Sequence, residues 1–410
     1  MRNNNQKVIR KLSARSMKKN RMRNLFAIGA ICLTSLLFTA VFSMGIGMGQ
    51  VFQEQTMMEV GGKFHAGLKH VTREQYEKIT DNPLVKSSTY NIYISMADNV
   101  RQRQAEIRVA SGEGELDQSF ARLKAGRLPE KEEELVADTI VLEALGISPE
   151  LGAKVPLEFE FMGRKVKQEF TLCGWYEGNE ISHASELYVS QAYYEKLSQG
   201  YTEQDFVENY RQTGNICGLV SGNIFFANAR NIEENIKEII RDAGYVPQGE
   251  AGENTNPDQV IEYGTNWAYL TSRTENLDPE TLILLAGAFL VILITGYLII
   301  YNIFQLSILK EIRFYGLLKT VGTTKKQLKN LVYRQVWKLS AVGIPLGLVL
   351  GFLAGQLLIP FLTRVSGYEG NGEIYFSPWI FVFGALFSLA TVFISCRKPA
   401  RIAGKVSPIE

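Results

Sequence analysis

Four long stretches without a charged residue constrain the fold of this 410-residue chain more than any other feature. A helix of about 20 residues crosses a hydrocarbon core of ~30 Å, and a Lys or Asp at its middle costs roughly 2.5–3.5 kcal/mol on insertion scales. We therefore predict four transmembrane helices, which excludes a soluble single-domain enzyme. The four stretches are Leu25–Met48, Thr281–Leu309, Leu339–Thr363 and Ile374–Cys396.

The charges between these stretches predict the orientation of the chain. Residues 1–24 carry nine basic residues and no acid, residues 310–338 carry eight basic residues and one acid, and residues 50–280 carry 22 basic and 38 acidic residues. Because basic loops stay in the cytoplasm, we expect a cell-membrane protein with both termini cytoplasmic and a large extracellular domain. The predicted segments are a basic cytoplasmic N-terminus at 1–24, transmembrane helix 1 at 25–48, an extracytoplasmic domain with helical stalks at 49–280, transmembrane helix 2 at 281–309, a cytoplasmic loop at 310–338, transmembrane helix 3 at 339–363, a short outer loop at 364–373, transmembrane helix 4 at 374–396 and a cytoplasmic tail at 397–410.

The extracytoplasmic segment mixes strand and helix patterns. Residues 154–177 predict a hairpin, because apolar and polar residues alternate on both sides of Met162 and Gly163. Three more strands and an amphipathic helix are predicted at residues 89–96, 104–110, 223–227 and 231–243. The fold class is therefore an α-helical membrane protein with an α+β extracytoplasmic domain inserted between transmembrane helices one and two.

The loop at 310–338 predicts a helix–turn–helix element. The second uncharged stretch is too long to end at the membrane surface, so we expect its helix to continue through Lys319 and to break at Gly322. Thr324 and Gln327 have the spacing of a capping box, which predicts the start of a helix that leads into the third span.

Four glycines in the third span, Gly343, Gly347, Gly351 and Gly355, recur every fourth residue and so share one helix face. Small residues at this spacing let another helix approach closely. Two interpretations stay open, packing against the chain's own spans or an interface with a partner, and the first is favoured.

We find no sequence motif for catalysis. The chain lacks a phosphate-binding loop, a nucleophile elbow and a zinc-protease motif, and its spans carry no charge that could relay protons or ions. We expect no catalytic residue, no cofactor and no metal. Cys173 and Cys217 lie in the predicted outer domain, and spacing alone does not decide whether they pair.

The basic N-terminus directly precedes a membrane span. We therefore expect it to set the topology and to contact anionic membrane lipids, and we expect no nucleic-acid partner. The first span is longer than a signal-peptide core of about 7–15 residues and has no convincing cleavage site after it, which favours an uncleaved anchor over a signal peptide.

The loop and the tail carry recognisable motifs. The loop reads Gly316-Leu-Leu-Lys319 and Val321-Gly-Thr323, and the tail contains Pro399-Ala-Arg401 and Pro408-Ile-Glu410. With weaker landmarks at residues 125–129, 134–137 and 151–155, these motifs resemble those of FtsX-like (MacB-type) ABC transporter permeases. Gln335 departs from that pattern, since many members have Glu there.

The resemblance implies a permease subunit that pairs with a separate ABC-type ATPase, whose motion passes through the loop and the spans to the outer domain. It also implies export, extraction of lipids or lipopeptides, resistance to antimicrobial peptides, or control of cell-wall enzymes, without intrinsic ATPase activity. The residues expected to contact the ATPase are Arg313, Tyr315, Gly316, Leu317, Lys319, Gly322 and Thr323.

Several alternatives remain open at this stage. The rival function is a membrane receptor or sensor that transmits ligand binding to a cytosolic partner; a membrane-anchored hydrolase lacks any motif. Because the chain stops at Glu410, where relatives continue, we expect a truncated permease, the first half of a longer one, or a subunit that needs a second copy. The acidic outer domain favours a cationic peptide as substrate, beside a lipid-linked one.

Overall fold

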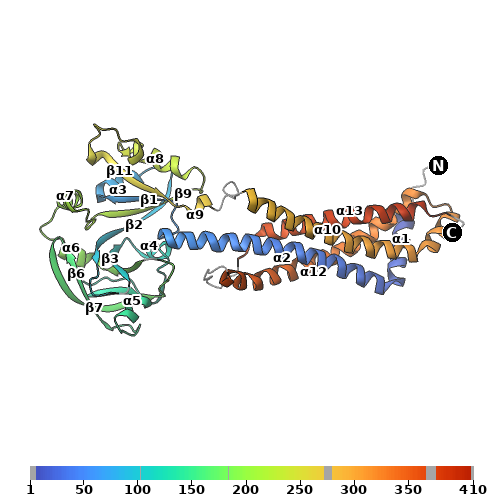
Figure 1. The fold of residues 1–410 in the computed structure, drawn as a ribbon, viewed down its shortest axis with the longest axis horizontal. Coiled ribbons are helices and arrows are strands. Elements are labelled where there is room, and N and C mark those ends of the chain that lie inside the picture. Colours follow the sequence, from blue (N-terminus) through green and yellow to red (C-terminus); the bar gives the residue numbers. More distant parts are fainter. Residues whose placement is uncertain (1–5, 102, 183, 272–278, 366–374, 408–410) are drawn as a thin grey trace. The chain divides into compact units, whose positions relative to one another are not determined.

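The computed structural model describes residues 6–101, 103–182, 184–271, 279–365 and 375–407 (Figure 1). The chain forms two compact units: a helical unit made of residues 1–51 and 277–410, and a sheet domain made of residues 52–276. The predicted outer loop at 364–373 lies outside the described residues from position 366 onward.

Long helices make up the helical unit. Their bounds are α1 Gln6–Lys19, α2 Arg21–Val60, α10 Pro279–Lys310, α11 Ile312–Thr320, α12 Lys325–Val365 and α13 Pro378–Lys405. Four of them, α2, α10, α12 and α13, are long and apolar enough to cross a membrane, as predicted. A helix suits such a segment because it satisfies its own backbone hydrogen bonds.

Three details of the helical unit differ from the expectation. The second long helix ends at Lys310, because Glu311 leaves the helical conformation with φ −103° and ψ 11°, and the short helix α11 follows. The third long helix continues past Thr363, the expected end of its span, to Val365, with Pro360 inside it. The N-terminus forms a helix of its own, α1, which the charge pattern did not predict.

The helices pack around α12 and α13. Helix α12 contacts α13 and α1, and α10 contacts α13. Their shared core includes the buried side chains of Ile31, Phe304, Val336, Val392 and Cys396. The opposite faces carry large exposed apolar side chains, as expected of helices surrounded by lipid.

The sheet domain is built on one 11-stranded sheet with the order β10-β11-β1-β9-β2-β3-β8-β5-β7-β4, and β6 pairs with β7 beside this path. Most neighbours are antiparallel, but β3–β8, β5–β7 and β10–β11 are parallel. The strands are β1 Ala66–Val71, β2 Val85–Met96, β3 Gln104–Ala110, β4 Leu123–Gly126, β5 Glu134–Asp138, β6 Lys154–Phe161, β7 Arg164–Tyr176, β8 Ala184–Val189, β9 Val220–Phe226, β10 Val246–Pro247 and β11 Val260–Thr265.

Short helices connect the strands and make this an α+β domain, as predicted. They are α3 Arg73–Thr80, α4 Glu113–Gln118, α5 Thr139–Ala144, α6 Gln191–Leu197, α7 Glu203–Thr213, α8 Ile232–Asp242 and α9 Ala268–Thr271, with 3-10 turns at Gln248–Glu250 and Pro257–Gln259. Helix α8 buries Ile232, Ile236, Ile239 and Ile240, which is the apolar face that its sequence spacing predicts.

The predicted hairpin is formed by β6 and β7. Phe161 pairs with Arg164, and the two turn residues Met162 and Gly163 both have positive φ, 48° and 77°. Such a turn matches the twist of the two strands. Alternate residues of β6 are buried, and Phe159 and Phe161 enter the main core.

Candidate coupling site and polar pocket

The elbow, residues 311–338, consists of α11, a four-residue turn and the first turns of α12. Gly322 has φ +94°, a left-handed conformation that glycine adopts without strain. The predicted capping box is present, because Thr324 N–H donates to Gln327 Oε1 at 2.9 Å and Gln327 N–H donates to Thr324 Oγ1 at 3.3 Å. These local contacts end α11 and start α12, so the elbow has a defined shape.

The structure divides the seven predicted contact residues into three groups. Arg313, Leu317 and Gly322 are exposed, Tyr315 and Gly316 are buried, and Lys319 and Thr323 are half-buried. Only the first group is exposed. The sequence analysis missed Val321, whose side chain is 84% exposed beside Leu317 at 66%. Leu317 and Val321 are four residues apart and form an exposed apolar pair at the end of α11.

Glu311, where α10 and α11 meet, binds the N-terminal part of the chain. Its Oε1 lies 2.6 Å from Arg23 Nη1 and also accepts a hydrogen bond from Asn20 Nδ2. Tyr315 OH donates to Oε2 at 3.1 Å. The side chains of Arg23 and Glu311 are only 18% and 12% exposed. Burial, and next the charge of Glu311, raise the pKa of Tyr315, so its hydroxyl stays protonated as a donor.

Two further contacts connect the elbow with the ends of the chain. Lys319 Nζ donates to the carbonyl oxygen of Val406, just after α13. In α12, buried Gln335 donates through Nε2 to Ser16 Oγ of α1 at 3.2 Å. Gln335 is the position that departs from the family pattern, and an amide there is a suitable donor to the hydroxyl. Sequence reasoning did not predict either contact, because the partners are far apart in the chain.

The four glycines of α12 face α2. A Cβ at Gly351 would lie 2.5 Å from the carbonyl oxygen of Leu36, and one at Gly355 would lie 2.6 Å from Ser43 Cβ. Gly343 and Gly347 meet α2 in the same way, one turn apart along the helix. The structure therefore places the glycine face against another helix of the same chain, at backbone distances that leave no room for a side chain.

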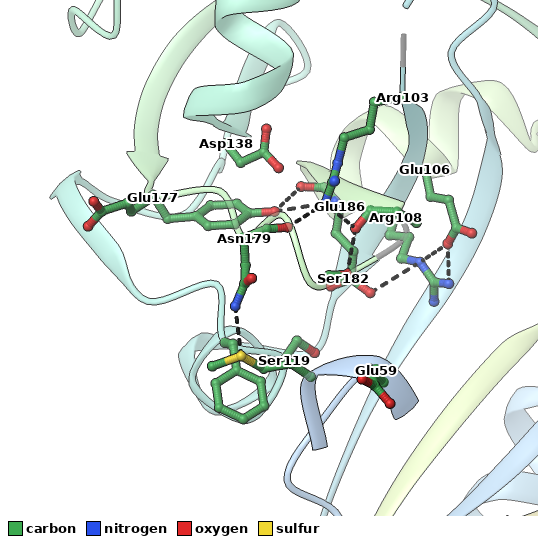
Figure 2. Close-up of a pocket in the computed structure, with 15 residues that line it drawn as sticks. Glu59, Arg103, Glu106, Arg108, Ser119, Asp138, Glu177, Asn179, Ser182 and Glu186 are labelled. Atoms are coloured by element: carbon green, nitrogen blue, oxygen red, sulfur yellow. Dashed lines mark hydrogen bonds and ion pairs between the residues drawn. The ribbon is translucent and has the colours of Figure 1, made fainter. Parts of the chain in front are cut away.

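The sheet domain contains a polar cavity of about 200 Å³ (Figure 2). Arg108 lies at its wall and pairs with Glu106, and its Nε is 3.6 Å from Glu186 Oε1. Arg103 donates from Nε to Ser185 Oγ at 2.7 Å. The carboxylates around the cavity outnumber the guanidinium groups: they are Glu59, Glu106, Asp138, Glu177 and Glu186, against Arg103 and Arg108.

Burial dominates the electrostatics of this cavity. It raises the pKa of Glu186, an effect that Arg108 opposes, and it raises the pKa of Asp138, whose Oδ1 accepts from Val141 N–H at 2.7 Å. Burial lowers the pKa of Arg108, but Glu186 and Glu106 more than offset it, so that the guanidinium stays charged. The excess of carboxylates favours cationic over anionic groups in this cavity.

The structure adds little for metals or disulfides. Among the described residues, no group of three or more His, Cys, Asp or Glu side chains is placed to hold a metal ion. Cys173 and Cys217 are both free thiols. Burial raises the pKa of Cys217 to about 12 and that of Cys173 to about 11, which makes both thiols unreactive at neutral pH.

The helical unit matches a known family. Residues 286–408 match the model of the family described as FtsX-like permease C-terminal. This stretch contains most of α10 and all of α11, α12 and α13. The resemblance inferred from the loop and the tail is confirmed for this part of the chain. No curated protein matches the chain.

Several solved structures are similar to this chain, including the following three. One is the extracellular domain of the noncanonic ABC-type transporter YknZ from Gram-positive bacteria, with 16% identity, 42% of this chain and 82% of that chain covered, and a TM-score of 0.26. Another is the periplasmic region of MacB from Actinobacillus actinomycetemcomitans, with 16% identity and a TM-score of 0.31. The match covers 53% of this chain and 95% of that chain. The third is a domain of a putative permease protein from Porphyromonas gingivalis, with 12% identity and a TM-score of 0.29. The match covers 49% of this chain and 87% of that chain.

Proposed function

We propose that the chain is the permease subunit of an ABC-type transporter, because residues 286–408 match the model of the family described as FtsX-like permease C-terminal. In this proposal the subunit itself is not an enzyme. A separate ATPase binds the elbow, and ATP hydrolysis there drives a conformational change of the sheet domain. The family match and the absence of a phosphate-binding loop from the sequence support this division of labour.

The proposed orientation follows the charge pattern. The basic segments at 1–24, 310–338 and 397–410 lie in the cytoplasm, and the sheet domain, with its excess of acidic residues, lies outside the cell. The four spans are those given by the uncharged stretches.

The observation that carries the assignment of the ATPase contact is the exposed apolar pair on the elbow, Leu317 and Val321. Both side chains lie outside the uncharged stretches, in a basic segment that the orientation places in water. Exposed apolar side chains among polar ones are typical of protein-binding surfaces, and Arg313 adds an exposed charge on the same helix. We assign this surface to the ATPase contact.

The buried members of the elbow have a different role in this proposal. Tyr315 and Gly316 pack inside the helical unit, and Lys319 binds the carbonyl of Val406. A force on α11 is therefore passed to α2 through Glu311 and to α13 through Lys319. Partly buried hydrogen bonds between packed helices suit this transmission, because such packing moves as a unit.

We also propose a second permease copy, or a second permease half, because a transporter with two-fold symmetry needs two such elbows. The substrate is a cationic peptide or a lipid-linked molecule. The excess of carboxylates at the cavity of Figure 2 supports a cationic group.

The test is co-expression of the tagged full chain with single ABC-type ATPases from the same organism, followed by purification in detergent. We expect one ATPase to co-purify and its ATP hydrolysis to respond to the permease. Leu317→Asp with Val321→Asp is expected to abolish both effects. Leu151→Asp is the matched control, because Leu151 is 54% exposed but lies in the sheet domain.

If the double variant, folded to the same extent, keeps its ATPase, the elbow is not the contact. If no ABC-type ATPase binds the unmodified chain, the permease assignment fails and the receptor alternative gains support.

A further inference from the structure

An open, basic hollow of about 510 Å³ lies at the turn between α1 and α2. Six consecutive residues line it: Lys18, Lys19, Asn20, Arg21, Met22 and Arg23. Four of the six are cationic, and the side chains of Lys18, Lys19 and Arg21 are exposed. The sequence predicts that the basic N-terminus contacts anionic lipids without naming the residues that bind them, and neither the family match nor the proposed ATPase contact accounts for a hollow at this turn.

The four cations of the hollow are not equivalent. Arg23 is paired with Glu311 and also donates from Nη2 to Asn24 Oδ1 at 3.1 Å. In the described part of the chain, Lys18, Lys19 and Arg21 have no acidic partner within ion-pair distance. Three like charges therefore gather on one open surface without an acidic side chain between them, and a bound anion would reduce their mutual repulsion.

Two hydrogen bonds hold the backbone around the hollow in place. Asn24 Nδ2 donates to the carbonyl oxygen of Met17 at 2.7 Å, which bridges the turn. Ser16, on the preceding turn of α1, accepts a hydrogen bond from Gln335 of α12. The backbone that carries the three free cations is thus held in place before any ligand arrives, which lowers the entropic cost of binding.

An exposed apolar surface begins directly beside the cations. Met22, Leu25 and Phe26 are 65%, 61% and 64% exposed, and their spacing places them on one face of α2. Leu25 and Phe26 also begin the first uncharged stretch of the sequence. Cationic side chains next to an apolar helix face occur at the level of lipid headgroups, where phosphate meets hydrocarbon.

We propose that the α1–α2 turn is a binding site for the phosphate headgroup of an anionic phospholipid. Lys18, Lys19 and Arg21 donate to the phosphate oxygens, and the acyl chains lie along Met22 and Phe26. Arg23 keeps its pair with Glu311, so that the bound lipid sits beside the junction of α10 and α11. The proposal rests on the proposed function only in placing this turn at the cytoplasmic surface of the membrane.

The test uses the purified full chain in a neutral detergent, with native mass spectrometry to count bound lipids. Phosphatidylglycerol and phosphatidylcholine are titrated in parallel. We expect the unmodified chain to prefer phosphatidylglycerol at least about tenfold. Phosphatidylcholine carries the same phosphate, but its trimethylammonium group cancels the negative charge and is repelled by the three cations. The triple variant Lys18→Gln, Lys19→Gln, Arg21→Gln is expected to lose this preference.

Two variants serve as matched controls. Arg397→Gln, Arg401→Gln, Lys405→Gln removes the same charge from exposed positions of α13 and is expected to keep the preference. Lys18→Arg, Lys19→Arg, Arg21→Lys keeps the charge of the turn and is expected to keep it too. If the charge-conserving variant retains binding while the neutral one loses it, misfolding of the neutral variant does not explain the loss.

Two results would overturn the proposal. Equal loss in the α13 control would mean that binding follows the total charge and not this turn. Displacement of phosphatidylglycerol by millimolar inorganic phosphate would mean a site for free anions and not for a lipid. Because the measurement does not involve the ATPase, its failure leaves the proposed transporter function untouched.

Discussion

The sheet domain and the helical unit place their large apolar side chains in opposite ways. In the sheet domain they fill a continuous buried core between the sheet and its helices. In the helical unit, large apolar side chains lie on the outer faces of α2, α10, α12 and α13; examples are Leu290, Val291, Leu353, Leu357 and Leu386. The sheet domain thus hides its large apolar side chains from water, whereas the helical unit exposes them on faces that suit lipid.

This difference means that different interactions hold the two units together. Burial of apolar area stabilises the sheet domain, at about 25 cal/mol per Å². Lipid offers apolar side chains the same environment as a protein core, so helices in a membrane associate through close packing and hydrogen bonds instead. In the helical unit, small residues at helix contacts should therefore contribute most to the free energy of unfolding. In the sheet domain, buried polar groups with satisfied hydrogen bonds should contribute most.

The largest effect is expected from a side chain added at the α2–α12 contact. In the double variant Gly347→Ala, Gly351→Ala each new Cβ would meet the backbone of α2, at Cys32 and at Leu36. Overpacking of this kind costs about 1–3 kcal/mol per site, so we expect a loss of several kcal/mol. The measurement is the midpoint of thermal unfolding of the full chain in detergent micelles.

The control is the double variant Gly29→Ala, Gly45→Ala on α2. A Cβ at either position meets nothing within 4 Å, and alanine is the better helix former by roughly 0.5–1 kcal/mol in water. We expect no loss of stability. An equal loss of thermal stability in both double variants would show that the loss does not come from a clash at the α2–α12 contact.

A smaller effect, from a buried polar group, is expected in the sheet domain. Glu115 is fully buried, and its carboxylate accepts from Asn91 Nδ2 at 2.7 Å, Gln118 Nε2 at 2.9 Å and Asn223 Nδ2 at 3.1 Å. Gln118 Nε2 also donates to Ser119 Oγ at 3.2 Å, so Glu115→Ala leaves two amides, those of Asn91 and Asn223, without this acceptor. At about 1–2 kcal/mol each we expect a loss of about 2–4 kcal/mol in the free energy of unfolding, read from hydrogen exchange of the domain in the full chain. Glu113→Ala, at an exposed position of the same helix, should change the free energy of unfolding by less than about 0.5 kcal/mol.

Among the polar contacts of the helical unit, the Arg23–Glu311 pair joins two charged side chains. Its loss should lower the free energy of unfolding less than the loss of Glu115 does, because the pair is partly exposed. Glu311→Gln removes one charge of the pair, and we expect a loss of about 1–3 kcal/mol. The exchanged pair, Arg23→Glu with Glu311→Arg, should recover part of this loss. Thermal unfolding of the unmodified chain, Arg23→Glu, Glu311→Arg and the exchanged pair gives the coupling energy, and a coupling near zero would contradict a structural role for the pair.

How far the sequence predicts this molecule depends on the range of the contacts. The four spans, the β6–β7 hairpin, helix α8 and the capping box at Thr324 follow from local patterns, and the structure contains all of them. The Arg23–Glu311 pair and the order of the sheet strands join residues far apart in the chain, and no local pattern encodes such pairings. A lone acid in a basic loop, Glu311, was the one signal available.

Residues 125–137 give a second example of contacts that the sequence pattern alone does not predict. The sequence marks these residues by resemblance alone, whereas the structure gives the reason. Gly126 approaches β7 so closely that a Cβ would lie 2.5 Å from Gly174 Cα. The guanidinium of Arg127 donates two hydrogen bonds to Glu134, at 2.6 and 3.0 Å. This pair closes the loop between β4 and β5.

The Arg127–Glu134 pair predicts a pH dependence in the sheet domain. The hydrogen bond from Arg127 holds the pKa of Glu134 at about 2, below its ordinary value of 4.5. The carboxylate therefore stabilises the fold above pH 4.5, and this contribution is lost as the pH falls toward 2. Because Arg127 is half-exposed, we expect Glu134→Gln to cost about 1–2 kcal/mol at pH 7 and almost nothing below pH 2.

Hydrogen exchange of β5 in the full chain, corrected for the intrinsic effect of pH, measures this contribution. The neighbouring variant Glu133→Gln should show no such dependence, since Glu133 is exposed and its carboxylate has no partner among the described residues. A pH-independent deficit in Glu134→Gln would assign its cost to packing rather than to the charge.

The smallest expected effect compares the same motif in both units. Thr72 and Gln75 cap α3 of the sheet domain as Thr324 and Gln327 cap α12. Each Thr→Ala change removes one cap and costs about 1 kcal/mol locally.

The two caps differ in the charges that follow. Helix α3 has an acid, Glu74, in its first turn, which complements the helix dipole, whereas α12 begins with Lys325 and Lys326, which oppose it. The cap at Thr324 therefore lacks the support that the other has, and Thr324→Ala should expose more amides to exchange than Thr72→Ala does. Hydrogen exchange of residues 325–328 and 73–76 measures both. Equal fraying would mean that packing of α12 outweighs its unfavourable charges, and the elbow would then be as rigid as the sheet domain.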